Sequence, residues 1–114
     1  MKFTKDQTFR FQKVGIKGWV YLGRDKFPQA GVCLVETKKG HETIIKSTKS
    51  AWFYFIIEGK GKFVIDGKKI LCQKEDLILV PKDTPFYYQG KMKMLLITIP
   101  AWEEKYEITL GKAS

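Results

Sequence analysis

Short β-type runs between closely spaced glycine and proline residues constrain the fold of this sequence more than any other feature. Runs rich in Val, Ile, Phe, Tyr and Trp lie at 18–23, 30–37, 42–47, 51–58, 62–67, 68–73, 76–81 and 91–100. No helical period is sustained, and only residues 101–106, after Pro100, could form a turn or two of helix. Short strands with turn residues between them indicate an all-β sandwich or barrel.

Two segments show how these strands pair and face. Asp66-Gly67 stands between two apolar runs, which predicts a tight hairpin turn. In 91–100, Lys91 and Lys93 should face solvent and send the alternate residues inward. The run 51–58 is apolar on both faces, so one face should line a barrel and the other should pack against a second layer or another chain.

The chain length and composition predict one globular domain. Its 114 residues are 44% hydrophobic and 14% aromatic. We expect a single domain over 1–114, with an N-terminal arm at about 1–14, a barrel at about 15–100 and a C-terminal tail at about 101–114. We expect no signal peptide, no membrane span and a cytoplasmic location, because the charged start carries no apolar run and no long apolar stretch follows. Cys33 and Cys72 are expected to be buried free thiols.

The net charge of +9 raises the question of nucleic-acid binding. The basic residues argue against it, because lysines occur in ones and twos at turns or alternate strand positions and no arginine cluster is present. We interpret the surplus as a solvated surface and predict no specific nucleic-acid partner.

Residues 58–90, EGKGKFVIDGKKILCQKEDLILVPKDTPFYYQG, resemble the central stretch of a small single-domain cupin. Gly40 and Gly59 match the two end glycines of the first cupin motif, and Pro81 and Pro85 match the second. The resemblance implies a cupin-type antiparallel β-barrel or jelly roll, with at most a short C-terminal helical turn.

The resemblance also implies where a cupin would hold its metal ion. Counted along both motifs, the four ligand positions fall on Lys46, Thr48, Trp52 and Phe86. Cupin metals need imidazole and carboxylate ligands, and protonated lysine, threonine, tryptophan and phenylalanine do not replace them. We therefore expect no metal ligands and no cofactor.

The same register predicts which side chains line the barrel interior. These candidate ligand-binding residues are Lys46, Thr48, Trp52, Tyr54, Phe86 and Tyr88. They would either fill the barrel as a solid core or line a pocket with a few polar anchors. The single histidine, His41, is interpreted as a turn residue near the barrel rim, because it has no convergent partners in the sequence.

Several functions fit this lining. The first is a metal-free barrel that binds a small polar metabolite, sugar-like or carboxylate-bearing. The second is a metal-independent isomerase, epimerase or lyase, for which Lys46, Tyr54 and Tyr88 are the catalytic candidates. A third, more distant one is a relative of the small cupin that closes the ectoine ring. The fourth is a non-catalytic dimerisation or partner-binding module with a filled barrel, and a homodimer is expected under all four.

Overall fold

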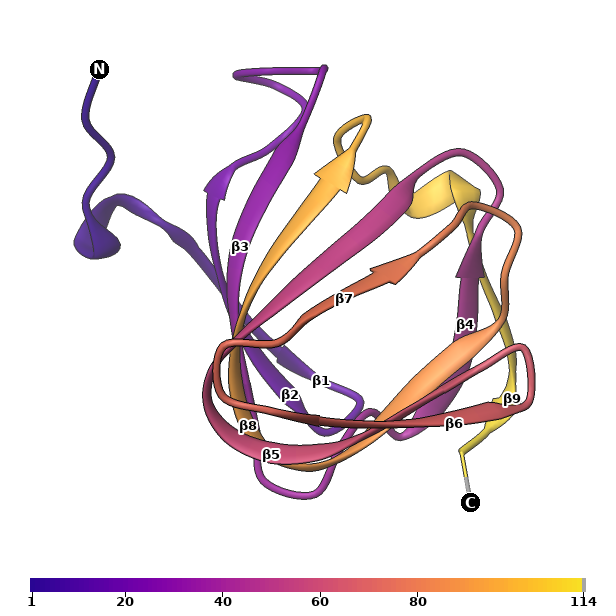
Figure 1. Cartoon of the computed structure of the whole chain (residues 1–114). Coiled ribbons are helices and arrows are strands. Elements are labelled where there is room, and N and C mark those ends of the chain that lie inside the picture. The colour runs from indigo at the N-terminus through magenta and orange to yellow at the C-terminus, as the bar shows by residue number, and fades with distance from the viewer. Residues whose placement is uncertain (114) are drawn as a thin grey trace.

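The protein is a curled antiparallel β-sheet with two single-turn 3₁₀ helices, seen in a computed structural model that describes residues 1–113 (Figure 1). The strands are β1 (Phe9–Lys13), β2 (Ile16–Leu22), β3 (Gly31–Thr37), β4 (Thr43–Ser47), β5 (Ala51–Ile65), β6 (Lys68–Gln73), β7 (Leu77–Val80), β8 (Phe86–Ile99) and β9 (Glu107–Lys112). The 3₁₀ turns are η1 (Lys5–Gln7) and η2 (Glu104–Tyr106). The prediction of an all-β antiparallel barrel is confirmed.

Two long strands, β5 and β8, pair along most of their length and belong to both halves of the barrel. On one side the strand order continues through β3 and β2 to β1, and β7 pairs with the first part of β5. On the other side β6 pairs with the end of β5, while β4 joins β8 and carries β9. Figure 1 shows β5 and β8 curling from one half into the other.

Glycines allow these two strands to bend where they cross between the halves. Gly59 and Gly90 have φ values of +89° and +123°, which side chains other than glycine rarely adopt. A β-carbon at either position would also collide with the backbone of the opposite strand. The bend is therefore encoded by residues that lack a β-carbon.

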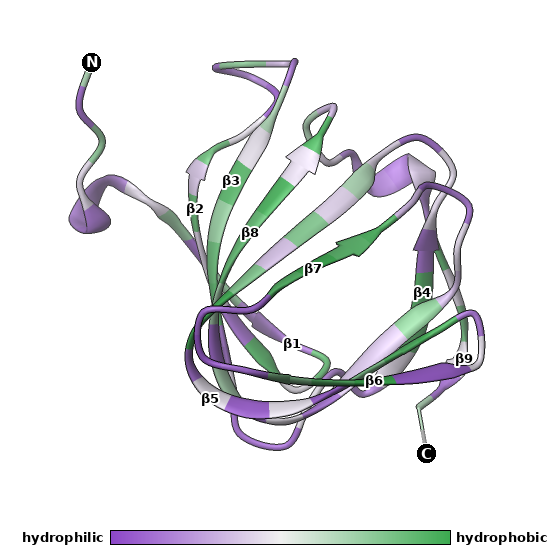
Figure 2. Ribbon diagram, viewed as in Figure 1, coloured by the Kyte–Doolittle hydropathy of each residue, from purple (hydrophilic) through white to green (hydrophobic). Residues whose placement is uncertain are grey.

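The core lies inside the curl and follows the predicted alternation. Trp52, Tyr54 and Ile56 of β5 are buried, whereas Phe55 is 39% exposed on the other face. On β8, Met92, Met94 and Thr98 point inward, as expected from the outward lysines. Figure 2 shows hydrophobic residues recurring along these strands. Asp66 and Gly67 both have positive φ and connect β5 to β6, which confirms the hairpin.

The two ends of the chain contribute strands that their sequence did not reveal. β1 lies in the predicted arm and β9 in the predicted tail, and both are short and half polar. The predicted helical turn after Pro100 is η2. Cys33 and Cys72 are buried and unbridged, as expected. Neither 3₁₀ turn, nor any other helix within 1–113, has the length and apolarity to cross a membrane.

Candidate functional site

Five aromatic side chains form a cluster at the base of the barrel interior. They are Trp52, Tyr54, Phe63, Phe86 and Tyr88, hereafter the interior aromatic cluster. Tyr54 occupies its centre, with ring centroids 5.1 Å from Phe63, 5.5 Å from Tyr88 and 5.9 Å from Phe86. Each of the five is at least nine-tenths buried. The structure thus brings together four predicted interior residues, Trp52, Tyr54, Phe86 and Tyr88.

His41 lies against this cluster rather than at the rim. Its ring meets Tyr88 edge-on, with centroids 5.6 Å apart, and its backbone N–H donates to the Tyr88 carbonyl at 2.9 Å. His41 is only 7% exposed. The placement of His41 at the rim was therefore wrong.

The hydrogen bonds of His41 determine which nitrogen can accept a proton. Nδ1 is 2.7 Å from the Thr43 carbonyl oxygen, which can only accept, so Nδ1 carries the hydrogen in the neutral ring. Nε2 then keeps its lone pair. Burial lowers the pKa of His41 below its ordinary value, although the Thr43 carbonyl and the Glu107 carboxylate raise it. At neutral pH, His41 is consequently a neutral imidazole with a basic Nε2.

The two tyrosines remain protonated over the physiological pH range. Burial raises the pKa of Tyr54 and of Tyr88, and the nearby Cys33 and Glu107 raise both further. Within the described residues, no hydrogen bond of good geometry reaches the buried Tyr88 hydroxyl or Trp52 Nε1, although the Tyr54 hydroxyl lies close enough to that of Tyr88 to affect its pKa. Both are donors whose burial is costly unless an acceptor reaches them.

Four side chains from the two ends of the chain gather beside the buried core, and we call this end of the barrel its mouth. This rim group consists of Phe11, Lys13, Trp102 and Glu107. The Lys13 ammonium lies 5.3 Å from the Trp102 ring centroid and 5.7 Å from that of Phe11. Trp102 Nε1 donates to a Glu107 carboxylate oxygen at 2.9 Å. Phe11 and Trp102 are partly exposed and pack against the core, so the mouth is lined by aromatic faces and one charge of each sign.

Two predicted site residues lie elsewhere. In β4, Ile45 and Ser47 are buried, so Lys46 between them points to the opposite face and is only half-buried. Thr48 lies in the turn after β4, where its N–H donates to the Tyr106 carbonyl. Their predicted interior position was wrong because the motif count slipped by one residue, which exchanges the two faces of a strand.

If the odd-numbered positions of this segment had been assigned to the core face, His41 would have been predicted to face the interior. It shares odd-numbered positions with Thr43, Ile45 and Ser47, and the last two of these face the core. Glu107 gave no sequence signal, because its position depends on β9 pairing with β4 opposite Ser47.

The residues do not fit a cupin metal centre. Of the four ligand positions, Trp52 and Phe86 are in the interior but cannot coordinate, and Lys46 and Thr48 are outside it. Among residues 1–113, no three His, Cys, Asp or Glu side chains converge to hold a metal ion.

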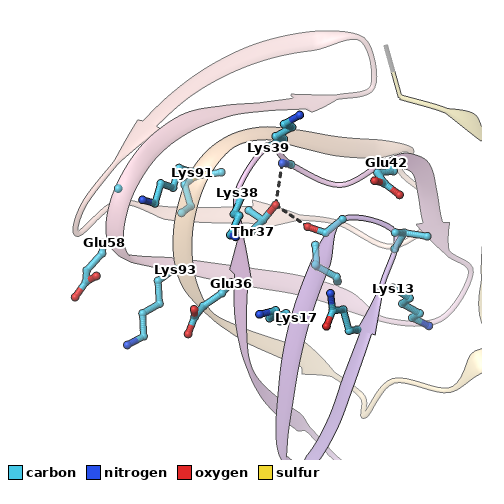
Figure 3. A pocket seen from close by; sticks show the side chains of 17 residues that line it. Lys13, Lys17, Glu36, Thr37, Lys38, Lys39, Glu42, Glu58, Lys91 and Lys93 are labelled. Atoms are coloured by element: carbon cyan, nitrogen blue, oxygen red, sulfur yellow. Dashed lines mark hydrogen bonds between the residues drawn. The ribbon is translucent and has the colours of Figure 1, made fainter.

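A separate hollow of about 880 Å³ lies beside the loops at Gly15 and Gly40 and the bend of β5 at Gly59 (Figure 3). Its walls are charged, with six lysines and three glutamates, Lys13 being shared with the rim group. Thr37 Oγ1 ties the two loops together, accepting from the Gly40 N–H and donating to the Gly15 carbonyl (Figure 3).

Comparison with solved structures defines the class of this protein. Pac13, described as a nucleoside dehydratase, superimposes with a TM-score of 0.93 at 32% identity, covering 100% of this chain and 93% of Pac13. KdgF from Halomonas sp. gives a TM-score of 0.75 at 12% identity, covering 90% and 96%. Oxalate decarboxylase from Bacillus subtilis gives 0.79 at 17% identity, covering 95% of this chain and 31% of its own. The fold is that of a small cupin domain, as the resemblance implied.

The family is more specific than the fold. Residues 27–104 match the family described as ethanolamine utilisation protein EutQ. The chain belongs to this family. No curated protein sequence matches it.

Three further Pac13 structures, from Streptomyces, carry uridine together with a single substitution. One replaces a histidine by glutamine, and the others each replace a tyrosine by phenylalanine. Those three positions follow one another at intervals of 13 and 34 residues. His41, Tyr54 and Tyr88 are spaced by the same two intervals.

Proposed function

We propose that this protein binds a nucleoside-like metabolite in its barrel and eliminates water from it, without a metal ion. The observation that carries the proposal is His41, a buried imidazole whose ring contacts Tyr88 and whose Nδ1 is bound to the Thr43 carbonyl, which leaves the lone pair on Nε2. The similarity to Pac13, with its matching spacing of histidine and two tyrosines, supports the same substrate class. The proposal develops the lyase alternative, with His41 as the base in place of the candidates Lys46, Tyr54 and Tyr88.

Elimination by an imidazole requires an acidified C–H bond. We infer that the carbon that loses the proton lies between two others in the substrate. One neighbour is a carbonyl carbon, and the other carries the hydroxyl that leaves. His41 Nε2 would take the proton, and the electron pair would pass into the carbonyl to give an enolate. When the electron pair returns from the enolate oxygen, it would form the C=C bond and expel the hydroxyl. The hydroxyl would leave as water, with the proton that His41 had taken.

The tyrosines would stabilise the enolate oxygen. Because burial raises their pKa, both hydroxyls stay protonated and can donate a hydrogen bond to negative charge. The Tyr88 hydroxyl makes no hydrogen bond of good geometry within the described residues and is therefore available for this role. The aromatic faces of Phe11 and Trp102 at the mouth suit a planar base.

The test uses uridine and uridine oxidised to a carbonyl on its ribose. Wild type should bind uridine in a calorimetric titration and convert the oxidised compound to a product lighter by one water. His41→Gln should retain uridine and lose at least about 100-fold in turnover, whereas Glu42→Gln, an exposed neighbour, should match wild type.

The main alternative is the filled barrel, and the packing of the interior aromatic cluster is the observation that favours it. It predicts no uridine binding and no turnover. Binding without turnover would instead support a non-catalytic metabolite-binding barrel.

A further inference from the structure

The outer face of the barrel wall carries a continuous apolar surface that is exposed at its β5–β7 end and half-buried or buried over β2, β3 and β8. Two rows of paired residues cross it, and because paired residues share a face, each row forms one stripe. The first stripe is Trp19, Leu34, Leu95, Phe55 and Leu77, and the second is Leu22, Val32, Ile97, Phe53 and Leu79. We call these ten residues the outer apolar face.

The exposure of this face increases toward β7. Phe55 is 39% exposed, Leu79 51% and Leu77 62%. At the opposite edge, η1 borders the face, with the Lys5 ammonium 4.5 Å from the Trp19 ring centroid. Contiguous apolar surface of this kind marks an interaction site.

One charged row borders the outer apolar face and restricts its partner. Lys17 pairs with Glu36, Glu36 with Lys93, and Lys93 with Glu58, so the signs alternate across four strands. Figure 3 shows the four side chains along the same stretch of wall. Within residues 1–113, none of the four forms an ion pair with another.

The order of these charges is self-complementary. Read in reverse, the row plus, minus, plus, minus becomes minus, plus, minus, plus. A wholly acidic or wholly basic partner would meet like charges at half of the row, whereas a second copy turned by a two-fold axis meets opposite charges throughout.

We propose that the outer apolar face is a dimer interface occupied by a second copy of this chain. The two-fold axis runs parallel to the strands, between β3 and β8, and stacks the two sheets face to face. Glu36 then faces the partner subunit's Lys93, and Lys17 faces the partner subunit's Glu58. In the first apolar stripe, Phe55 covers the partner subunit's Trp19. This interface is independent of the elimination reaction.

Charge reversal tests this pairing between chains. Wild type should be a dimer by size-exclusion chromatography with light scattering. Glu36→Lys alone and Lys93→Glu alone should each weaken the dimer at least about tenfold, because like charges would then face each other across the axis. Mixing the two variants should give a heterodimer, because every charged pair between unlike chains then has opposite signs. Within each variant chain, positions 36 and 93 still carry charges of the same sign, so the rescue would report the pairing between chains.

An apolar substitution provides the matched comparison. Phe55→Lys should weaken the dimer at least about tenfold, whereas Leu71→Lys, on β6 away from this face and 83% exposed, should not. Circular dichroism melting would confirm that each variant is folded. A monomeric wild type, a dimer that survives Phe55→Lys in a folded protein, or a mixture that stays monomeric would overturn the proposal.

Discussion

At the scale of single residues, the candidate site depends on a few buried polar atoms whose neighbours set their chemistry. His41 is neutral because burial disfavours its charged form, and its free nitrogen is determined by the Thr43 carbonyl. Tyr88 stays protonated because burial disfavours its phenolate. Both effects follow from position in the barrel and not from the residue types alone.

His41 should make stability depend on pH. Its folded pKa is lowered, so as pH falls below about 6.5 the unfolded chain binds the proton first and gains relative stability. The stability that neutral His41 contributes is therefore fully present above about pH 6.5 and is lost as the pH falls through the pKa of His41 in the folded protein. Urea unfolding of wild type and His41→Gln between pH 5 and 8, a window set by the range in which histidine titrates, should show this loss in wild type alone. Parallel profiles would contradict it.

The same pKa predicts the pH profile of elimination. Only the neutral imidazole can take a proton, so turnover should rise with pH through the lowered pKa of His41 and be flat at neutral pH. Initial rates with the oxidised uridine at saturating concentration would measure it. A rate that still rises above pH 7.5 would identify another group as the base.

Tyr88→Phe should separate stability from activity. The substitution removes a buried hydroxyl that makes no hydrogen bond of good geometry within the described chain. The free energy of unfolding should therefore stay the same or rise by up to about 2 kcal/mol. Loss of a donor to the enolate should slow turnover by about 100-fold. Urea unfolding and rate assays on the same preparation provide both readouts, and a destabilised, fully active variant would contradict this assignment.

At the scale of elements, the Phe11 ring of β1 lies directly against Gly18 of β2 and packs against the core. A β-carbon at Gly18 would collide with the Phe11 ring, so this close approach requires glycine. Gly18→Ala should destabilise the protein by about 1–3 kcal/mol. Much of that loss should return in the double variant with Phe11→Leu, because the collision partner is smaller.

Gly23→Ala, in the connection that follows β2, provides a control. A β-carbon there meets the nearest heavy atom, an Asp25 carboxylate oxygen, at 3.2 Å, and that side chain can move. Chemical denaturation of the four proteins would measure the differences. Equal losses for Gly18→Ala and Gly23→Ala would show that the Phe11 contact is unimportant.

At the scale of the whole molecule, aromatic side chains stand at two of the four positions where the cupin motifs place metal ligands. Trp52 and Phe86 occupy interior positions where cupin ligands would lie, and their rings are in contact at a centroid distance of 5.4 Å. Elemental analysis should therefore find no stoichiometric Fe, Mn, Ni or Zn, and EDTA should leave the melting temperature unchanged. Stoichiometric metal that EDTA removes with a lower melting temperature would refute this prediction.

The single-domain division and the cytoplasmic location remain predictions from the sequence, as does the absence of a specific nucleic-acid partner. The EutQ family assignment and the Pac13 similarity place the barrel among small cupins.

The sequence by itself determined the strands between the two ends of the chain, the hairpin turn at Asp66-Gly67 and the two faces of β5 and β8, but not β1 or β9. Those features follow from a period of two and from local turn chemistry, as at Asp66-Gly67. Only the tertiary structure decided that Lys46 points out and that His41 meets Tyr88. The physical reason is that a single residue in the turn after β4 exchanges the two faces of the strand, and that contacts between distant strands depend on register across the whole sheet.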